Sequence, residues 1–480
     1  MIDFQSLWGG LDWLVLLVYF VGVLSVGVFM HRTASKSFKS FFVASRRLTI
    51  PVLIGVAAAG WYDSWTIVGL AECGATMGIS ILFIYVVPTA IIRLPLAIWI
   101  GPYTRDMIPD HVVTLPDLIH YFYDRKTKVL GSVVPIFSVL YSAALLFAVG
   151  EVLHLVSGFP IYTAVAITGV GIIFYTAMAG LWGLAVTDLI QFAVMTVSAG
   201  AVALGIITYF GGLAPMYEQI AAIDPLLLTP LGHNTALDVL AWVISAAALY
   251  VNAQSYQRFG AAKGGAQIKV SYTLMLTLGI CFSTVMVFAG MASSVMFPDA
   301  NTVAEGFWGT IFTVLPAGFR GLFVAALVAA VMSTSSADIL ISAAILAKDV
   351  IKDFFVPNLS DQGTLKLTRA LIVVLGIFII FGTYFWSDGI GKAYYYIGGF
   401  QVAVFFIPIV GGFFYKKKTA TGGFITVLAG IFGYAIWQFG LGSPFGVPSN
   451  VFTWVLSLVV YFIACNATYK GGNGGAKQVA

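Results

Sequence analysis

Residues 49–77 read TIPVLIGVAAAGWYDSWTIVGLAECGATM, and this stretch decides what kind of fold the chain can adopt. A bilayer core needs about 20 consecutive, mostly apolar residues per helix, so the stretch is long enough to cross one. Its middle contains Gly60, which weakens a helix, and Asp63, an ionisable group at bilayer depth. We expect an unwound segment there, whose freed carbonyls bind a cation at the membrane midplane. The alternative is a continuous helix whose small residues allow close packing.

The remaining sequence predicts a multi-pass membrane protein built only from α-helices. Of the 480 residues, 60% are hydrophobic and 9% are charged, whereas soluble domains average about 45–50% and 25%. The apolar residues form about thirteen blocks of membrane-spanning length. The expected spans are 11–30, 49–77, 80–103, 129–153, 159–179, 184–210, 237–256, 269–296, 319–347, 369–387, 393–414, 420–440 and 450–467.

The basic residues predict an N-terminus outside and a C-terminus in the cytoplasm. With that orientation, all but three of the 24 Lys and Arg residues lie inside; Arg320 and Lys392 lie outside, and Arg93 lies within a span. This is a strong positive-inside signal. The net charge of +4 follows from topology and predicts no nucleic-acid partner. The first span lacks a basic flank and a cleavage site, so we interpret it as a retained helix, not a signal peptide.

A second polar interruption, AAVMSTSSAD at residues 329–338, lies in the span 319–347. Hard cations prefer oxygen ligands, and on a helix Ala330, Ser333 and Thr334 share one face. The run therefore predicts a cation site. A single hydroxyl would more often bond back to the preceding turn and bend the helix, but four hydroxyls followed by Asp338 favour the cation site.

Other ionisable residues also fall within expected spans, where each is costly and is a candidate for function. Asp188 follows the turn Gly180–Gly183, and its alternative role is to stabilise a helix start. Glu72 and Glu151 are expected near the outer interface, and Arg93 is either a structural partner for a carboxylate or a functional residue.

Four segments together resemble the sodium/solute symporter family. They are AVMST at 330–334, WGLAVTDLIQ at 182–191, NAQSYQRF at 252–259 and the pair Lys348-Asp349. The resemblance covers nearly the whole chain and implies the leucine-transporter fold, in which two inverted five-helix repeats cross the membrane. It divides a single transporter domain, 1–480, into an extra helix 11–30, repeats 49–210 and 237–414, two extra helices within 420–467 and a cytoplasmic tail 468–480.

The resemblance also implies a sodium site. Its ligands are the carbonyls of Ala59, Tyr62 and Ala330 and the hydroxyls of Ser333 and Thr334. A second cation site is implied at Asp188 and Ser336. Ala337 stands where members that couple two sodium ions have serine, so the number of coupled ions stays open.

The solute is expected beside the interruption at Asp63. The expected solute-binding residues are Asp63, Ser64, Thr66, Tyr141, Trp242, Asn252 and Gln401. Trp65 and Thr66 replace the pair that binds sugar in relatives, which argues against a hexose. Asp63 departs from the family, where this position is small or carries a hydroxyl, and three roles remain open: binding an amine-bearing or cationic solute, carrying a proton, or none.

The sequence thus predicts sodium-coupled uptake of a small organic solute, such as an amino acid or a monocarboxylate, by alternating access in the cell membrane. Na⁺ is the coupling ion, the partners are the solute and the lipid bilayer, and a monomer suffices. Alternatives are a sodium-independent facilitator or channel, or a membrane sensor, for which the short tail leaves no signalling domain. We expect no enzyme, because the five histidines are scattered and lack metal-ligand spacing.

Overall fold

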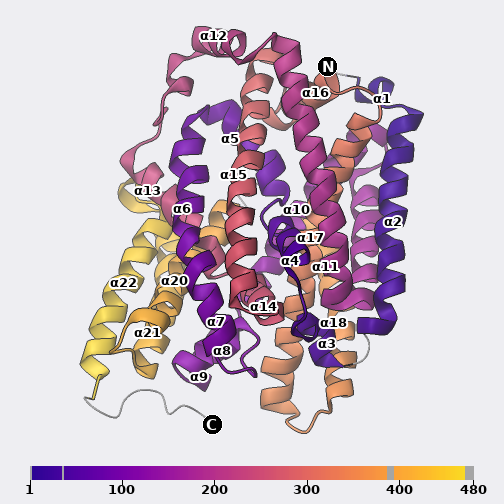
Figure 1. Ribbon diagram of the computed structural model, residues 1–480. Coiled ribbons are helices and arrows are strands. Elements are labelled where there is room, and N and C mark those ends of the chain that lie inside the picture. The colour runs from indigo at the N-terminus through magenta and orange to yellow at the C-terminus, as the bar shows by residue number, and fades with distance from the viewer. Residues whose placement is uncertain (1–2, 35–36, 386–393, 471–480) are drawn as a thin grey trace.

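The computed structural model describes residues 3–34, 37–385 and 394–470, and within these ranges the regular elements are helices (Figure 1). The expected span ends between 386 and 393, Lys392, and the tail beyond 470 with Lys477 lie outside the described residues. The α-helices are α1 Phe4–Leu7, α2 Gly10–Ala34, α3 Phe38–Val43, α4 Ile50–Ala59, α5 Leu70–Met77, α6 Val87–Pro95, α7 Gly101–Met107, α8 Leu115–Phe122, α9 Arg125–Gly131, α10 Val134–Ser157, α11 Ile161–Phe210, α12 Leu213–Ile223, α13 Ala236–Ser245, α14 Ala253–Ala261, α15 Gly265–Met296, α16 Val303–Val314, α17 Phe319–Ile345, α18 Asp361–Gly382, α20 Gly399–Phe414, α21 Ala420–Ala435 and α22 Ser449–Thr468.

The described part of the chain contains 11 helices that are long and apolar enough to cross a membrane, against about thirteen expected spans. Two features account for the difference. The 50-residue α11 holds two expected spans, which meet at Gly180, where φ is 52° and the backbone leaves the helix. The expected span 49–77 is divided in the middle, so only the short apolar helix Ile50–Ala59 remains continuous there.

The break in the expected span 49–77 lies where Gly60 and the polar residues after it predict it. α4 ends at Ala59, residues 60–63 form a turn, and the helix resumes as a π-helical segment, Trp65–Gly69, followed by α5. The Tyr62 amide donates to the Ala58 carbonyl (2.8 Å), and the Ile67 amide donates to the Asp63 carbonyl (3.2 Å). The turn is therefore ordered by its own backbone bonds, as buried backbone must be.

A second break divides the expected span 237–256. α13 ends at Ser245, a 3₁₀ segment covers Ala246–Tyr250, and α14 starts after Asn252. Asn252 has an extended backbone, and its side chain caps α14 by accepting from the Gln254 amide (2.8 Å). The expected span is present, because Ala236–Ala261 is long and apolar enough to cross a membrane, but its interruption is not predicted from the sequence. Two broken helices face each other inside the bundle, the arrangement that transporters use to build central sites.

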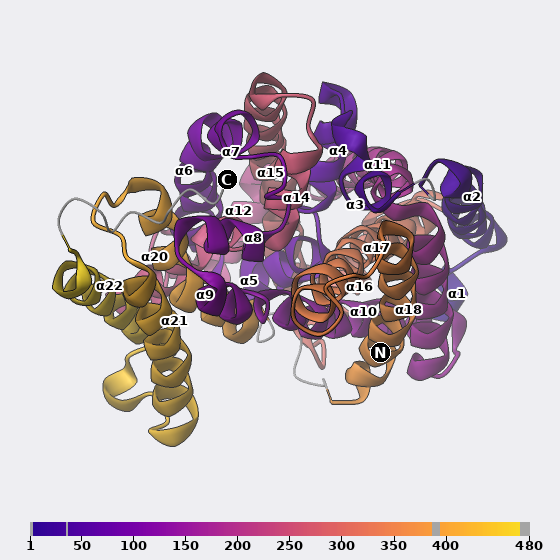
Figure 2. The same cartoon turned by 90° about the horizontal axis from the view of Figure 1, so that it is seen from below.

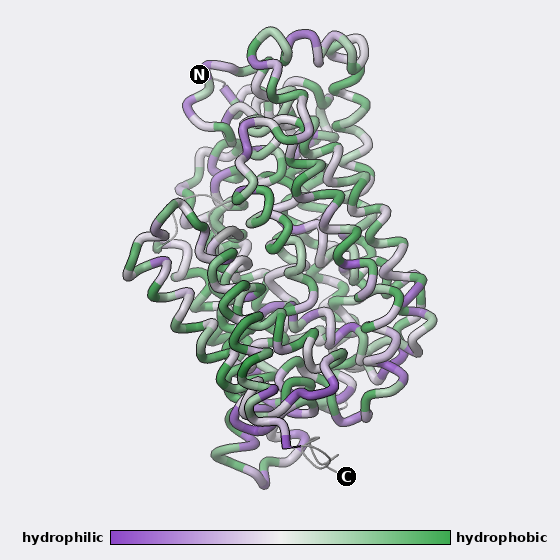
Figure 3. Tube along the Cα trace, turned by 90° about the vertical axis from the view of Figure 1, so that its left-hand side faces the viewer, coloured by the Kyte–Doolittle hydropathy of each residue, from purple (hydrophilic) through white to green (hydrophobic). Residues whose placement is uncertain are grey.

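The chain ends lie at opposite ends of the bundle (Figure 1). At the C-terminal end, basic residues expected in the cytoplasm contact the other loops of that end: Arg46 pairs with Asp110, and Arg125 donates to the Asp353 carbonyl (2.7 Å). Arg320, which is expected outside, lies at the other end, where it donates to the Leu7 carbonyl near the N-terminus (2.6 Å). Hydrophobic residues run along the bundle between these ends (Figure 3). The contacts agree with an N-out, C-in topology.

The hydroxyl-bearing helix α17 lies at the centre of the bundle and is buried along its apolar length. It packs against α10, α11, α2 and α18. α21 and α22 lie at one edge of the molecule and α2 at another (Figure 2). The first broken helix also packs against α15. The backbones approach so closely there that a Cβ on Gly290 of α15 would lie 1.8 Å from the Ala71 carbonyl oxygen. Only glycine permits this approach, which fixes α5 against α15.

Candidate cation and solute site

The first break meets the hydroxyl face of α17. The Ser333 hydroxyl lies 3.1 Å from the Ala59 carbonyl oxygen and 3.0 Å from the Ala330 carbonyl oxygen. Ala59 ends α4, so its carbonyl lacks the next helical turn that would otherwise bond it. Beside it, the Thr334 hydroxyl oxygen is buried and makes no hydrogen bond within the described residues. A buried hydroxyl without a partner is costly, and this one lies on the same helix face as Ser333 and Ala330, so it is available to a ligand bound there.

Tyr62, the remaining residue expected at the cation site, is held by its ring. The ring stacks on Phe282, with centroids 4.0 Å apart, and contacts Phe192 at 5.7 Å. This packing directs the side chain toward α15 and α11 and fixes the backbone of residue 62 in the turn. All five residues expected at the site therefore lie on two elements that touch at Ser333. The set supplies only oxygen ligands, the kind that hard cations prefer.

A cavity of about 90 Å³ opens between the two breaks. Space for about one water requires about 10–15 Å³ on this measure, so the cavity accommodates several waters or one small solute. Four residues expected to bind solute line it: Asp63, Thr66, Tyr141 and Asn252. The lining also contains Gly60, Trp61, Trp65, Leu70, Tyr85, Val86, Arg93, Ser138, Ala248, Leu249, Gln254, Ser283, Thr334 and Asp338.

Asp63 is the polar centre of the first break. Its Oδ1 accepts from the Thr66 amide (3.0 Å) and the Thr66 hydroxyl (3.1 Å), and its Oδ2 accepts from the Tyr141 hydroxyl (2.9 Å). The Thr66 hydroxyl is also 2.6 Å from the Trp61 carbonyl oxygen. The Thr66 amide and the Tyr141 hydroxyl thus orient a carboxylate that is 9% exposed, and the Thr66 hydroxyl shares its single proton between Oδ1 and the Trp61 carbonyl. The sequence places Asp63 at the break but does not reveal these partners.

Two further charged groups reach the cavity from other elements. Arg93 on α6 donates from Nε to the Ala246 carbonyl of the second break (2.9 Å). Asp338 on α17 accepts from Gln254 Nε2 (2.6 Å) and from the Ser142 hydroxyl (2.9 Å). The cost of intramembrane charge marks both residues in the sequence. Neither is assignable to this cavity from sequence alone, because both depend on contacts far along the chain.

Three of the expected solute-binding residues lie outside the lining of the cavity. Ser64 is fully buried. Trp242 stacks on Trp65, with ring centroids 5.8 Å apart, and so lies beside a residue that lines the cavity. Gln401 donates from Nε2 to the Val134 carbonyl (3.0 Å), joining α20 to α10.

Asp188 and Ser336, the residues expected as a second cation site, both lie near Tyr175. The Tyr175 hydroxyl donates to the Ser336 hydroxyl (2.7 Å), and Ser336 donates to the Ser333 carbonyl (3.1 Å). One oxygen of the buried Asp188 carboxylate makes no hydrogen bond within the described residues. The charge of Arg258 acts on Asp188. Ser336 thus connects this region directly to the first site.

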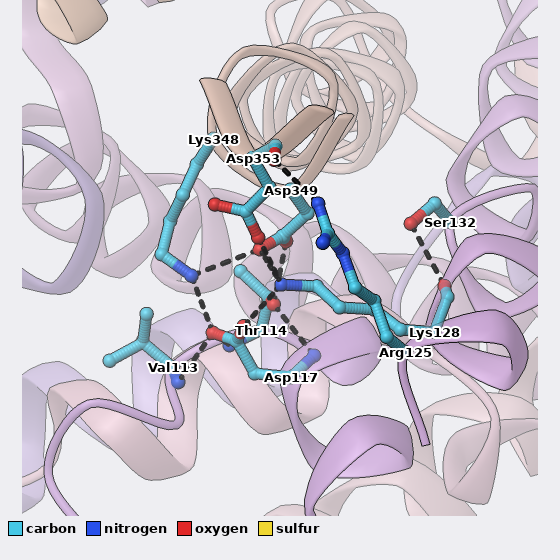
Figure 4. A network of polar contacts seen from close by, with 9 residues as sticks. All are labelled: Val113, Thr114, Asp117, Arg125, Lys128, Ser132, Lys348, Asp349 and Asp353. Carbon is cyan, nitrogen blue, oxygen red and sulfur yellow. Dashed lines mark hydrogen bonds and ion pairs between the residues drawn. The ribbon is translucent and has the colours of Figure 1, made fainter. Parts of the chain in front are cut away.

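An ion-pair network ties the π-helical segment Leu346–Phe355, which continues α17, to α8 and α9 (Figure 4). Lys128 lies 3.0 Å from Asp117, 3.0 Å from Asp349 and 2.7 Å from Asp353. Lys348 lies 2.7 Å from Asp117 and 2.9 Å from Asp349. Asp349 also accepts from Thr114 (2.8 Å). Because both lysines share two carboxylates, the network joins three elements and opposes their separation.

Asp117 is expected to keep its charge and its two ion pairs between about pH 8 and pH 6, so its part in closing the cytoplasmic end should not depend on pH in that range. Burial alone would raise the pKa of Asp117, but Lys348 and Lys128 offset it and hold the pKa well below its usual range. A depressed carboxyl pKa gives stability that is lost only as pH falls through the low folded value. In a cysteine-free background, labelling of Ser138→Cys from the cytoplasmic side measures closure. Its rate, normalised to the denatured protein, should stay constant; a several-fold rise at the lower pH would contradict this.

Two broken helices around a small cavity, a cation-type oxygen set and a bridged cytoplasmic end define a secondary active transporter. The model of the Sodium:solute symporter family matches residues 41–430, and the chain belongs to this family. Its function is sodium-coupled symport, with Na⁺ as the coupling ion, and its relatives are membrane transporters rather than enzymes.

Individual relatives are similar over most of their length. The chain is 26% identical over 444 residues to the sodium/pantothenate symporter of Escherichia coli (strain K12), covering 88% of this chain and 89% of that one. It is 22% identical to the osmoregulated proline transporter OpuE of Bacillus subtilis (strain 168), covering 94% of each. It is 24% identical to sodium-coupled monocarboxylate transporter 1 of Homo sapiens, covering 91% and 73%.

A solved structure shares the fold. A Na⁺-coupled sialic acid symporter in a substrate-bound outward-open state aligns with a TM-score of 0.83 at 18% identity, covering 96% of this chain and 98% of that one. A nucleobase-cation-symport-1 family transporter aligns with a TM-score of 0.56 at 12% identity, covering 92% and 98%. The predicted leucine-transporter fold is confirmed.

Proposed function

We propose that the coupling sodium ion binds between the end of α4 and α17. Its ligands are the carbonyls of Ala59, Tyr62 and Ala330 and the hydroxyls of Ser333 and Thr334. The observation that carries this proposal is the contact of the Ser333 hydroxyl with both the Ala59 and the Ala330 carbonyl, beside a Thr334 hydroxyl without a partner. A cation there is coordinated by both elements at once, so it stabilises the conformation in which they are in contact.

The solute binds in the adjacent cavity, which is lined by both breaks. Thr334 belongs to the cation site and to the cavity lining, so the ion and the solute stabilise the same wall. The cavity volume suits a small organic solute such as an amino acid or a monocarboxylate. The names of the relatives above include pantothenate, proline and monocarboxylates, all of which are small organic acids.

Transport then requires the cytoplasmic network to separate after the cavity closes on the outer side. Asp63 and Thr66 hold the first break against α10 through Tyr141, and the Lys128 and Lys348 network holds the far end of α17. We infer that rocking of the broken helices, within repeats 49–210 and 237–414, closes the outer side of the cavity and separates the cytoplasmic network. A single chain contains all of these parts, and its lipid-facing surface needs no partner for the cycle.

The energy of one sodium ion suffices for uphill transport. One ion moving down a tenfold gradient releases about 1.4 kcal/mol, and about 2.3 kcal/mol more comes from 100 mV of membrane potential. The sum supports about 500-fold accumulation of a neutral solute. A second ion at Asp188 and Ser336, supported by the unpartnered Asp188 oxygen, would steepen the gradient further.

A thermal-stability screen of the purified protein tests the proposed function. Amino acids, monocarboxylates, polyols and vitamins are added in sodium or in choline buffer, because a ligand that binds the folded state stabilises it by mass action. We expect sodium alone to stabilise the protein, and the transported solute to add a shift that requires sodium. Equal solute shifts in choline would instead favour a sodium-independent facilitator.

A further inference from the structure

Two opposite charges face the cavity from separate elements without forming an ion pair. Asp63 belongs to the first break and Arg93 to α6, and both line the cavity. The structure gives no ion pair between Arg93 and any described carboxylate, although the charges of Arg93 and Asp63 act on each other. Charged groups inside a membrane protein normally pair with one another or with backbone carbonyls, and they mark substrate pathways.

The guanidinium of Arg93 is fixed in position but incompletely bonded. Its Nε donates to the Ala246 carbonyl (2.9 Å), and its plane lies over the Trp61 ring, 4.5 Å from the centroid. The side chain is buried at 8% exposure, and its two terminal nitrogens make no hydrogen bond within the described part of the chain. A buried guanidinium with free donors is suited to a carboxylate, which accepts two parallel N–H bonds.

In the ranges that the structure describes, Asp63 lacks a cationic hydrogen-bond donor in the same way that Arg93 lacks a carboxylate. Its donors are neutral groups of Thr66 and Tyr141, and among the described residues no cation bonds to it directly. A carboxylate offers about four lone-pair sites, which leaves capacity for an ammonium donor. Asp338 also lines the cavity, but it is less exposed than Asp63 (3% against 9%), and Gln254 and Ser142 bond to it from two other helices.

We propose that the solute is a small zwitterion whose ammonium binds Asp63 and whose carboxylate binds Arg93. This inference rests on the proposed function, because it assigns the solute class of the same cavity. Asp63 and Arg93 together carry no net charge, so a zwitterion neutralises each of them. A carboxylate without an amine leaves Asp63 unpaired beside the new negative charge, and an amine without a carboxylate leaves Arg93 unpaired. Each mismatch costs affinity, which gives the site its specificity.

Matched sets of solutes test the assignment in sodium buffer. L-alanine and β-alanine are compared with propionate and ethylamine, and L-proline with cyclopentanecarboxylate and pyrrolidine. Thermal titration of the full chain gives the concentration of half-stabilisation. We expect at least one zwitterion to bind at least tenfold more tightly than both of its counterparts. The proposal is overturned if no zwitterion stabilises the protein, or if a counterpart binds as tightly as its zwitterion.

Two substitutions assign the groups. Asp63→Asn should weaken the zwitterion at least tenfold, to the level of its carboxylate counterpart, without weakening that counterpart. Arg93→Gln should weaken the zwitterion at least tenfold, to the level of its amine counterpart, without weakening that counterpart. Arg93→Lys keeps the charge and should have a smaller effect. Asp338→Asn tests the other carboxylate of the cavity lining, and we expect the preference for the zwitterion to survive it. Loss of that preference in Asp338→Asn but not in Asp63→Asn would overturn the role of Asp63.

The sodium shift measured without solute separates this inference from the proposed function. A normal sodium shift in each variant shows that it is folded and that its cation site is intact, so a changed solute preference then reports on Asp63 or Arg93 alone. Absence of a sodium shift in the wild-type protein would instead contradict the proposed cation site.

Discussion

Ser333→Ala and Thr334→Val are each expected to raise the sodium concentration of half-stabilisation by at least tenfold. Each substitution removes one oxygen ligand and leaves the helix in place, and valine closely matches threonine in shape. A hydrogen bond to a charged group is worth about 1.5–3 kcal/mol, which corresponds to about tenfold to a hundredfold in a binding constant. The measurement is the melting temperature of the purified protein as sodium replaces choline at constant ionic strength.

Ser335→Ala provides the matched control. Ser335 belongs to the same hydroxyl run, is fully buried and likewise has no hydrogen bond within the described residues. Its position on the helix directs it away from the face shared by Ala330, Ser333 and Thr334. Its removal should leave the sodium midpoint within about twofold of the wild type. Equal shifts in all three variants would indicate a general effect on α17 and would contradict the assigned ligands.

Asp349→Ala is expected to shift the protein strongly toward conformations open to the cytoplasm. The Asp349 carboxylate has no exposed surface and contacts Lys128, Lys348 and Thr114. Breaking a buried ion pair costs about 3–5 kcal/mol. Both lysines keep their ion pair with Asp117, so we expect the closed conformation to lose about 3 kcal/mol, which is about a hundredfold in the conformational equilibrium.

Labelling of Ser138→Cys from the cytoplasmic side measures this shift, in a background without Cys73, Cys281 and Cys465. Ser138 lines the cavity, so its labelling requires the cytoplasmic path to open. Asp353→Ala is the control within the same network, because its side chain is 38% exposed and contributes less. An unchanged labelling rate in Asp349→Ala, with the protein folded, would show that the network does not hold this end closed.

The sequence carries enough information to predict the helices, their orientation and the first break. Apolar block length and the distribution of Lys and Arg determine the first two. At the first break, Gly60 and Asp63 interrupt an apolar helix locally, so the interruption is visible without any knowledge of the fold. The face formed by Ala330, Ser333 and Thr334 is likewise local, because helical periodicity alone aligns these residues.

The second break has a weaker local signal, since only Asn252, which caps α14, marks it in the sequence. Residues 246–251 read AAALYV, which contain neither glycine nor a charge. Their helix is interrupted through tertiary contacts: Arg93 binds the Ala246 carbonyl, and the Tyr256 hydroxyl binds the Tyr250 carbonyl (2.8 Å). The pairing of Asp117 with Lys348 is similarly remote in sequence. Contacts of this kind depend on the assembled bundle, which is why the sequence identifies the charged residues but not their partners.

The most direct test of the central claim is an experimental structure of the protein in sodium, at a resolution that locates the ion. We predict an ion enclosed by the carbonyl oxygens of Ala59, Tyr62 and Ala330 and the hydroxyls of Ser333 and Thr334. An ion bound elsewhere, with the Ser333 hydroxyl still donating to the Ala59 carbonyl, would contradict the account.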